Sequence, residues 1–228
     1  MQRTYKFNNI MNFRDLGGFH SEHGITKIGV IYRSARLNEM DDEDIETFKQ
    51  MGIKSVLDLR SKDDNINKPD RTLEIPGVNN FHVAVNGDGR LPKDENGMAD
   101  MYFEMISNPE NAKEVLQVII NAPKPLLIHC AVGKDRTGIY ANMILEAAGV
   151  DIDDRQAHYL ESYSHLRRYA LNNWDFVKTL PRALFTPCLS YLEDFNELFY
   201  KTFGTLDNYL ISIGLTNTEI TKLKKLLV

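Results

Sequence analysis

Short apolar segments alternate with amphipathic segments along the first two thirds of the chain. Runs of β-branched and apolar residues predict strands at residues 30–33, 55–59, 80–85 and 126–129. Helical spacing of apolar positions predicts helices at residues 41–51, 98–106, 110–120 and 136–148. Strands that alternate with helices build a parallel sheet covered by helices. The pattern therefore predicts an α/β fold with a central, mostly parallel sheet of four or five strands flanked by helices.

The pattern changes after Asp151, where the β-branched runs stop and the remaining sequence predicts helices separated by proline and glycine. A chain of 228 residues is within the size that one hydrophobic core can organise. We therefore expect a single domain over residues 1–228, with an α/β core at 1–150 and a helical extension of the same domain at 151–228.

The composition is that of an ordinary globular protein, with 43% hydrophobic and 26% charged residues. The 27 Lys and Arg residues against 32 Asp and Glu residues give a net charge of −5. This acidity, without any long basic run, argues against nucleic acid as a partner and against a broadly basic membrane-facing surface. A local positive pocket can still bind a small anion.

Two features bear on cofactors and compartment. Cys130 and Cys188 match neither a CxxC redox pair nor a zinc-ligand pattern, and we expect neither a metal nor a cofactor. Residues 1–10 lack the apolar core of a secretory signal, and no apolar run has membrane-spanning length. We expect a cytoplasmic protein without stable membrane insertion, or a secreted one if a signal has been removed. The sequence does not indicate an oligomeric state.

The segment from Ile128 to Gly138 carries the chemistry. A cysteine ends an apolar strand, five loop residues follow, and Arg136 opens a helix. Inward-pointing loop N–H groups, the helix N-terminus and the arginine together suit a tetrahedral dianion. The same positive field favours the thiolate form of Cys130, which is then a nucleophile aimed at phosphorus. We assign phosphate binding to Ala131, Val132, Gly133, Lys134 and Arg136.

Two other interpretations of this segment are weaker. Gly133-Lys134 invites a nucleotide-binding loop, but that motif requires glycine where Ile128 stands and Ser or Thr where Asp135 stands. A buried, inert cysteine is the common fate of a lone cysteine. The arginine six positions after Cys130 favours the catalytic interpretation.

Residues 129–138, HCAVGKDRTG, match the H-C-x-x-G-K-D-R-T-G signature of the C-x5-R protein tyrosine phosphatases. The chain thus resembles bacterial tyrosine and phosphoinositide phosphatases. Further motifs of that group have similar counterparts in the same order, at residues 12–18 (NFRDLGG), 32–35 (YRSA), 58–61 (DLRS) and 203–210 (FGTLDNYL). The resemblance therefore extends over nearly the whole chain.

The resemblance implies a role for each loop residue. Cys130 would attack phosphorus and form a phosphocysteine, and Arg136 would stabilise the charge on the phosphoryl oxygens. Asp135 would protonate the leaving oxygen and then activate water. The rival candidates for the acid are Asp63, Asp64, Asp88 and Asp100.

Supporting roles also follow from the resemblance. His129 would orient the loop by hydrogen bonding to its backbone, and Thr137 would donate to the thiolate or assist its release. Lys134 is either a second cation for a polyanionic substrate such as a phosphoinositide headgroup or a solvent-facing lysine at the loop tip. Ion pairs under the site are expected from Arg14, Asp15, Arg33, Asp58 and Arg60.

Two surrounding segments bear on substrate access. Residues 86–97 are rich in Gly, Asp and Asn and predict an exposed loop that could close over the site. Aromatic residues after the core could line the substrate, but such residues in a helical region usually pack in the core, and we expect this of Tyr159, Tyr163, Tyr169 and Trp174.

The function predicted is a cofactor-independent phosphatase that hydrolyses phosphotyrosine monoesters of phosphoproteins, with phosphoserine and phosphothreonine left open. The alternative substrate class is phosphoinositides. Two alternatives from other classes are a catalytically silent module that binds phosphorylated residues and a rhodanese-like sulfurtransferase.

Overall fold

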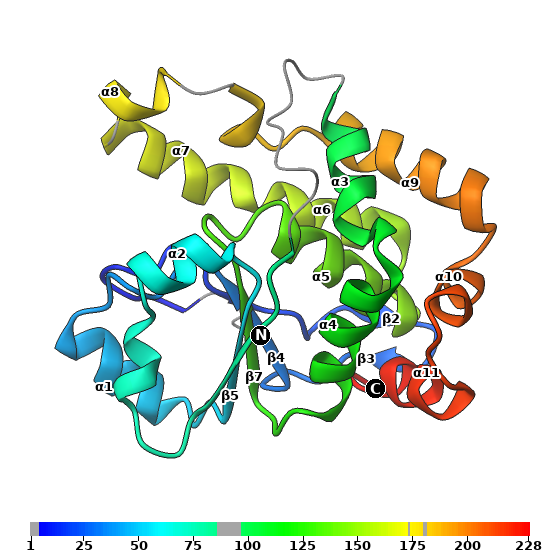
Figure 1. Cartoon of the computed structure of the whole chain (residues 1–228), viewed down its shortest axis with the longest axis horizontal. Helices are drawn as coiled ribbons and strands as arrows, with labels where there is room; N and C mark the ends of the chain where they lie inside the picture. Colours follow the sequence, from blue (N-terminus) through cyan, green and yellow to red (C-terminus); the bar gives the residue numbers. More distant parts are fainter. Residues whose placement is uncertain (1–4, 86–96, 173, 180–181) are drawn as a thin grey trace.

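The structure is a computed structural model that describes residues 5–85, 97–172, 174–179 and 182–228. The predicted loop at 86–97, except Gly97, and the candidate acid Asp88 lie outside these residues. A central sheet lies between layers of helices, and the C-terminal helices, orange to red, lie outside the green helices that cover one face of the sheet (Figure 1).

The sheet has five strands, and all its inner pairings are parallel. In spatial order they are β1 (Arg14–Asp15), β4 (Ile31–Ser34), β7 (Leu126–His129), β5 (Ser55–Asp58) and β6 (Asn79–His82). Among the described strands of this sheet, only the short edge strand β1 pairs antiparallel, with β4. The predicted α/β class and the mostly parallel sheet are confirmed.

The register brings the carboxyl ends of the central strands to one level. His129, the last residue of β7, pairs with Ser34 of β4 on one side and with Asp58 of β5 on the other. Ligands of open α/β sheets bind outside these carboxyl ends. The residues that follow β4, β5 and β7 therefore meet at one edge of the sheet.

Helices connect the strands and then continue to the end of the chain. Those of the first part are α1 (Asp42–Gln50), α2 (Lys62–Asn67), α3 (Met98–Ser107), α4 (Pro109–Asn121) and α5 (Arg136–Ala147), with a 3₁₀ turn η1 at Arg71–Glu74. The later ones are α6 (Ile152–Leu160), α7 (Ser162–Asn172), α8 (Trp174–Val177), the 3₁₀ turn η3 (Arg182–Leu184), α9 (Leu189–Phe203), α10 (Leu206–Ser212) and α11 (Asn217–Lys224). None of the helices in the described ranges is long and apolar enough to span a membrane.

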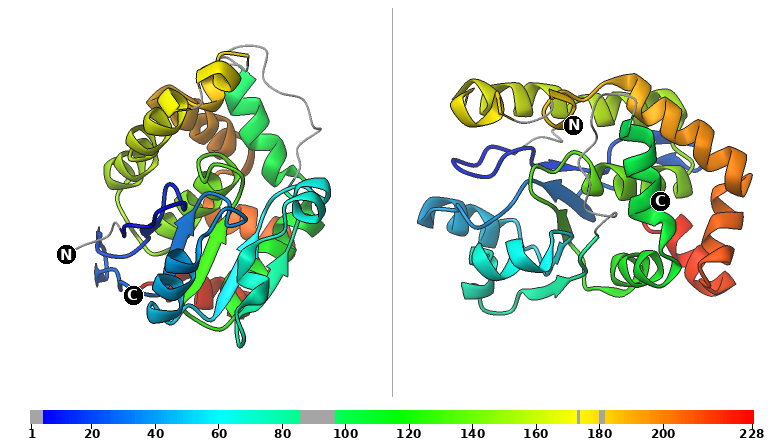
Figure 2. Two further views of the ribbon diagram at one scale, coloured as in Figure 1. Left: turned by 90° about the vertical axis from the view of Figure 1, so that its left-hand side faces the viewer. Right: turned by 45° about the horizontal axis from the view of Figure 1, so that its top comes forward.

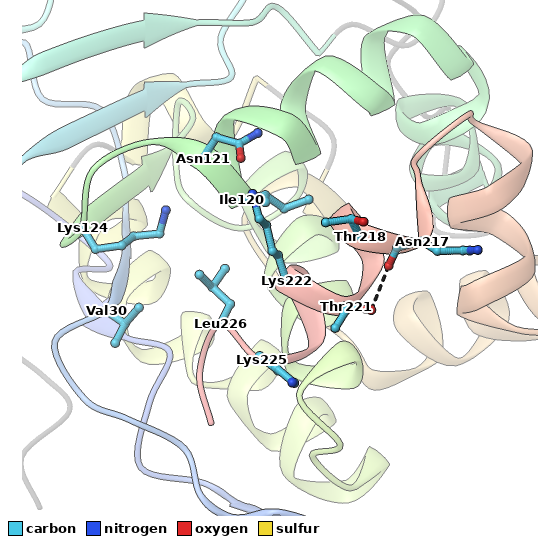
Figure 3. Close-up of a pocket in the computed structure, with 10 residues that line it drawn as sticks. All are labelled: Val30, Ile120, Asn121, Lys124, Asn217, Thr218, Thr221, Lys222, Lys225 and Leu226. Carbon is cyan, nitrogen blue, oxygen red and sulfur yellow. Dashed lines mark hydrogen bonds between the residues drawn. The ribbon is translucent and has the colours of Figure 1, made fainter.

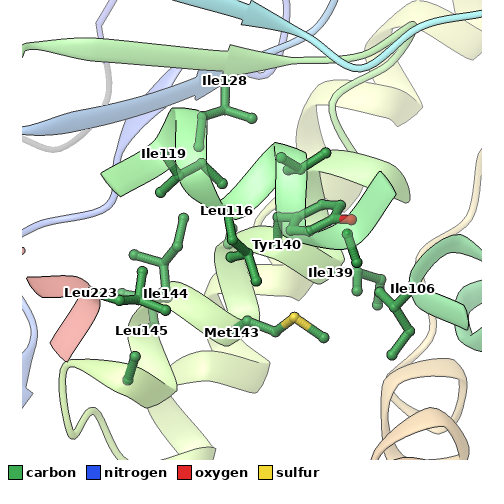
Figure 4. Close-up of a cluster of buried hydrophobic side chains, with 14 of the residues drawn as sticks. Ile106, Leu116, Ile119, Ile128, Ile139, Tyr140, Met143, Ile144, Leu145 and Leu223 are labelled. Carbon is green, nitrogen blue, oxygen red and sulfur yellow. The ribbon is translucent and has the colours of Figure 1, made fainter. Parts of the chain in front are cut away.

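The sheet separates two hydrophobic clusters. Leu126 and Ile128 of β7 face the larger cluster, where α3, α4, α5 and α11 pack together (Figure 4). Leu127 faces the smaller cluster, which contains Phe48 of α1. This alternation is the two-residue period of a strand buried on both faces, and it explains the continuous apolar run in the sequence.

Candidate active site

Cys130 follows the central strand β7 directly and is 1% exposed. Helix α5 begins at Arg136, so residues 131–135 form a loop between the cysteine and the helix N-terminus. Gly133 has a φ of +68°, and a Cβ there would lie 2.4 Å from the carbonyl oxygen of Ser34. Only glycine fits this close approach of the loop to the end of β4.

Three donors outside the loop bind three successive loop carbonyls. The bonds are Asn12 Nδ2 to Val132 O at 3.0 Å, the Arg36 N–H to Ala131 O at 3.3 Å, and the Arg33 guanidinium to Gly133 O. Since the C=O and N–H of a trans peptide point in opposite directions, the N–H groups of residues 132–134 point away from these donors. Successive N–H groups turned the same way form an anion-binding nest. Phosphate binding by this loop stays a prediction.

The buried arginines beneath the loop differ partly from the expected ion pairs. Arg60 pairs with Asp58 at 2.8 Å, as predicted, and Arg14 lies 3.3 Å from Glu161. Arg33 forms no described ion pair and donates instead to the loop carbonyl; burial lowers its pKa to about 10. Asp15 accepts 2.7 Å hydrogen bonds from the backbone N–H groups of residues 17 and 29, a turn-forming role that the prediction of an ion pair did not include.

Asp135 lies at the end of the loop, 9% exposed, and is held by two donors. The Tyr102 hydroxyl of α3 donates to Asp135 Oδ1 at 2.6 Å, and Lys134 Nζ lies 3.1 Å from the same oxygen. The hydroxyls of Tyr102 and Tyr159 are 2.8 Å apart. Burial, together with the nearby Asp135 carboxylate, raises the pKa of Tyr102 well above its usual value. Tyr102 therefore stays protonated and donates to Asp135 throughout the neutral range.

Lys134 is fully buried, so the solvent-facing alternative is wrong. Its ammonium donates to the carbonyl oxygen of Ala183 at 2.5 Å and lies 5.7 Å from the centre of the Tyr191 ring. Asp135 is the third neighbour of this ammonium, so its charge faces protein groups and not solvent.

Arg136 is half-buried and donates from Nη1 to the carbonyl oxygen of Leu59 at 3.3 Å. The neighbouring Thr137 Oγ1 is buried and has no hydrogen-bond partner among the described residues. Both residues belong to the first turn of α5, whose N–H groups have no partners within the helix. An anion above Cys130 would meet unsatisfied donors here.

His129 faces carboxylates and not the loop. Its Nε2 lies 2.8 Å from Asp70 Oδ2, and neither ring nitrogen hydrogen-bonds to the loop backbone in the described part of the chain. The expected role in orienting the loop backbone is therefore corrected: His129 contacts Asp70, a residue that the sequence did not indicate. The side chains of Asp58, Asp70 and His129 could ligate a metal by type, but Arg60 Nη2 lies 2.8 Å from both carboxylates and takes the cation position.

The rival acids lie apart from these contacts. Asp63 and Asp100 are exposed on α2 and α3, and Asp64 interacts with the N-cap residue Ser61. No hydrogen bond or ion pair recorded for the described residues joins these three to residues 130–136. Asp135 is the carboxylate that the structure places in the loop.

The fold and the loop define a class of enzyme, and comparison with known proteins identifies it. The model of the Tyrosine phosphatase family matches residues 5–228, so the chain belongs to this family and is a protein-tyrosine phosphatase. The enzyme class predicted from the loop signature is thus confirmed.

Two relatives by sequence agree with this assignment. A Cupriavidus necator protein assigned as a tyrosine-protein phosphatase is 30% identical, covering 90% of this chain and 81% of that protein. The triple specificity protein phosphatase PtpB of Mycobacterium tuberculosis is 24% identical, covering 95% of this chain and 96% of that protein. Among solved structures, the catalytic core of the PP-IP phosphatase SIW14 from S. cerevisiae is 20% identical with a TM-score of 0.39, covering 86% of this chain and 94% of that one.

Proposed function

We propose that this chain hydrolyses phosphotyrosine monoesters of phosphoproteins with Cys130 as the nucleophile. The observation that carries the proposal is the loop whose carbonyls are bound from outside, which leaves its N–H groups for a phosphate above the cysteine. The N-terminus of α5 and the guanidinium of Arg136 add positive potential at the same place. Each step uses only groups of this chain and water.

The first step transfers the phosphoryl group to sulfur. The Cys130 thiolate forms an S–P bond as the P–O bond to the tyrosine breaks, and Asp135 gives its proton to the departing oxygen. Arg136 holds the equatorial oxygens while charge spreads over them. The Tyr102 hydroxyl at 2.6 Å fixes the position of the Asp135 carboxyl group for this transfer.

The second step restores the enzyme. Asp135, now ionised, accepts a proton from a water molecule whose oxygen attacks phosphorus, and the S–P bond breaks to return the thiolate. Thr137 Oγ1 lies in the first turn of α5, buried and without a described partner, and it would donate to the returning thiolate. Inorganic phosphate is the second product.

The geometry favours a single phosphate group in the loop. Because the Lys134 ammonium is bound to Ala183 O and lies beside Asp135, it is not free to bind a second phosphate. We therefore propose phosphotyrosine as the principal substrate group. Phosphoserine, phosphothreonine and phosphoinositides are further substrates to test, since the mycobacterial relative is named for triple specificity.

The decisive substitution is Cys130→Ser, assayed with a chromogenic aryl phosphate. We expect turnover to fall below detection while a phosphotyrosyl peptide still binds, because the loop donors remain. Cys188→Ser is the matched control, since Cys188 is the other cysteine of the chain, and it should keep wild-type turnover. Turnover that survives Cys130→Ser contradicts the proposal.

Two assays of the wild-type protein distinguish the proposed phosphatase from the binding module and the sulfurtransferase. Acid quench during turnover should trap a phosphocysteine, which a silent binding module does not form. A sulfurtransferase would instead transfer sulfur from thiosulfate to cyanide, and we expect no such activity.

A further inference from the structure

The surface formed by α7, α8 and η3 combines exposed apolar side chains with cations. Tyr163, Leu171 and Trp174 are 47%, 66% and 60% exposed. The core packing expected for Tyr163 and Trp174 is therefore wrong, whereas Tyr159 is buried at 2%. A groove of about 480 Å³ runs between these elements. We call this the α7–α8 surface, and its defining residues are Tyr163, Arg167, Leu171, Trp174, Lys178 and Arg182.

The α7–α8 surface carries a charge opposite to that of the whole chain. Residues 162–186 contain four Lys and Arg residues and one acidic residue, a net charge of +3, which leaves −8 on the rest. Lys178 contacts Asp175 at 2.6 Å. Neither Arg167 nor Arg182 takes part in an ion pair recorded within the described ranges, and both are exposed. Positive charge is therefore concentrated where the apolar side chains are exposed.

This surface is connected to the catalytic loop. Ser162, the first residue of α7, accepts a hydrogen bond from Arg14 at 3.0 Å and lies 3.4 Å from Asn12 Nδ2. Asn12 in turn binds the loop carbonyl of Val132. Helices α7 and α8 run along the outer margin of the molecule, on the side of the sheet where the strands end (Figures 1 and 2). A partner on this surface would lie beside the active site.

We propose that the α7–α8 surface docks on an anionic lipid bilayer. Basic residues interleaved with Trp and Leu on an exposed helical surface are typical of helices that lie in the membrane interface. Trp174 and Leu171 would enter the headgroup region, while Arg167 and Arg182 would reach the lipid phosphates. The acidic remainder of the chain would be repelled by the same bilayer, so charge fixes which side of the molecule faces the lipid.

Docking would bring the catalytic loop close to phosphomonoesters held at a membrane surface. These include phosphotyrosine on membrane-bound proteins and phosphoinositide headgroups, which share the phosphate chemistry of the loop. This consequence rests on the proposed function, whereas docking itself does not.

Trp174 is the only tryptophan of the chain, so its fluorescence reports this surface alone. The test uses the full chain as Cys130→Ser, which cannot turn over lipid. Vesicles of phosphatidylcholine are compared with vesicles in which a third of the lipid is phosphatidylserine. We expect a blue shift and quenching by brominated acyl chains with the anionic vesicles only. An unchanged spectrum with anionic vesicles overturns the proposal.

The second test removes charge. Each cation near an anionic bilayer raises the partition coefficient of the protein by a factor of about five. Arg167→Gln with Arg182→Gln should therefore lower this coefficient, measured by co-sedimentation with vesicles, about 25-fold. The matched control is Lys222→Gln with Lys225→Gln, an exposed cation of α11 and the exposed C-cap residue of the same helix. Both line a pocket with Lys124 (Figure 3), and α11 lies far from α7 and α8 (Figure 1). This control should sediment like the parent.

Each remaining outcome is decisive. If the two double variants sediment with vesicles to the same extent, the docking proposal is overturned. It is also overturned if a soluble phosphotyrosyl peptide binds Arg167 and Arg182 and thereby displaces the chain from vesicles. Hydrolysis of a soluble aryl phosphate by the Arg167/Arg182 variant should equal wild type. Absence of that hydrolysis in the wild type would contradict the proposed function and leave the vesicle results to stand separately.

Discussion

Gly133 and Gly52 show how one residue type is required for different reasons. Their φ angles are +68° and +66°, but a Cβ on Gly133 would lie 2.4 Å from Ser34 O, whereas a Cβ on Gly52 would have nothing within 4 Å. Both glycines relieve backbone strain, and only Gly133 also allows a close backbone approach.

The pair of substitutions to alanine separates these effects. Gly52→Ala should cost about 1–2 kcal/mol of unfolding free energy, the left-handed backbone cost alone, and leave kcat unchanged. Gly133→Ala should cost more and abolish turnover, because the loop must move away from Ser34. Urea unfolding and aryl phosphate kinetics measure both; wild-type kcat in Gly133→Ala would show that the contact does not shape the loop.

The hydrogen bond from Tyr102 to Asp135 makes a second prediction at this scale. Tyr102→Phe should lower kcat/KM, which reports the transfer of the phosphoryl group to Cys130, about tenfold for esters with a poor leaving group, the worth of one hydrogen bond. Esters with a good leaving group need no proton in this step, so their kcat/KM should equal that of the wild type. Tyr140→Phe is the control, since the buried Tyr140 hydroxyl has no described partner. If the rate falls equally with both kinds of ester, Tyr102 supports the fold and does not act through the proton transfer by Asp135.

The site residues that the sequence predicts are those that local spacing defines. Cys130 and Arg136 are predicted because six positions join a strand end to a helix start. Tyr102 and Ala183 were not found, because their contacts with Asp135 and Lys134 join distant positions of the chain. Such contacts follow from tertiary packing and leave no local pattern.

Among the elements, length decides what the sequence predicts. The predicted strand at 126–129 coincides with β7, and the predicted helix at 136–148 closely matches α5. The two-residue strand β1 and the six-residue helix α2 are too short for any hydrophobic period to show. Tyr163 of α7 is expected in the core but is exposed, because an aromatic residue alone does not indicate which side of a helix is buried.

The end of β5 sets a pH dependence. Asp58 is 3% exposed; burial alone would raise its pKa, but His129 and hydrogen bonds from Arg60 and Asn65 lower it from 3.8 to about 2. A lowered carboxyl pKa stabilises the fold above the unfolded value of 3.8, and this contribution is lost as the pH falls toward 2.

The expected loss is about 2 kcal/mol of unfolding free energy. Urea denaturation of the wild type from about pH 5 to about pH 2 should show it. Asp58→Asn should start from lower stability and lack this part of the slope, since the amide does not titrate. If the free energy of unfolding falls with pH equally in both proteins, Asp58 is not the source of the pH dependence.

At the scale of the molecule, the C-terminal helices pack on the α/β core. Phe103 of α3 stacks on Phe203 of α9 with ring centres 5.8 Å apart, and the Tyr209 hydroxyl donates to Ile106 O at 3.0 Å. Residues from both parts share the larger hydrophobic cluster. We therefore propose that 1–150 and 151–228 form one cooperative unit.

Calorimetry tests this unity. One thermal transition is expected, with equal calorimetric and van't Hoff enthalpies, because neither part buries its apolar face alone. Two transitions, or an enthalpy ratio well above one, would show separate units and contradict the single domain expected from the sequence.

The bond between Lys134 and the carbonyl of Ala183 also constrains how this chain can be recombined with its relatives. The lysine belongs to the catalytic loop, whereas the carbonyl belongs to the segment that leads into α9. A chimaera joined between these two positions would combine a loop from one parent with a backbone path from the other. Functional recombinants should therefore inherit both positions from the same parent, although 48 residues separate them in the sequence.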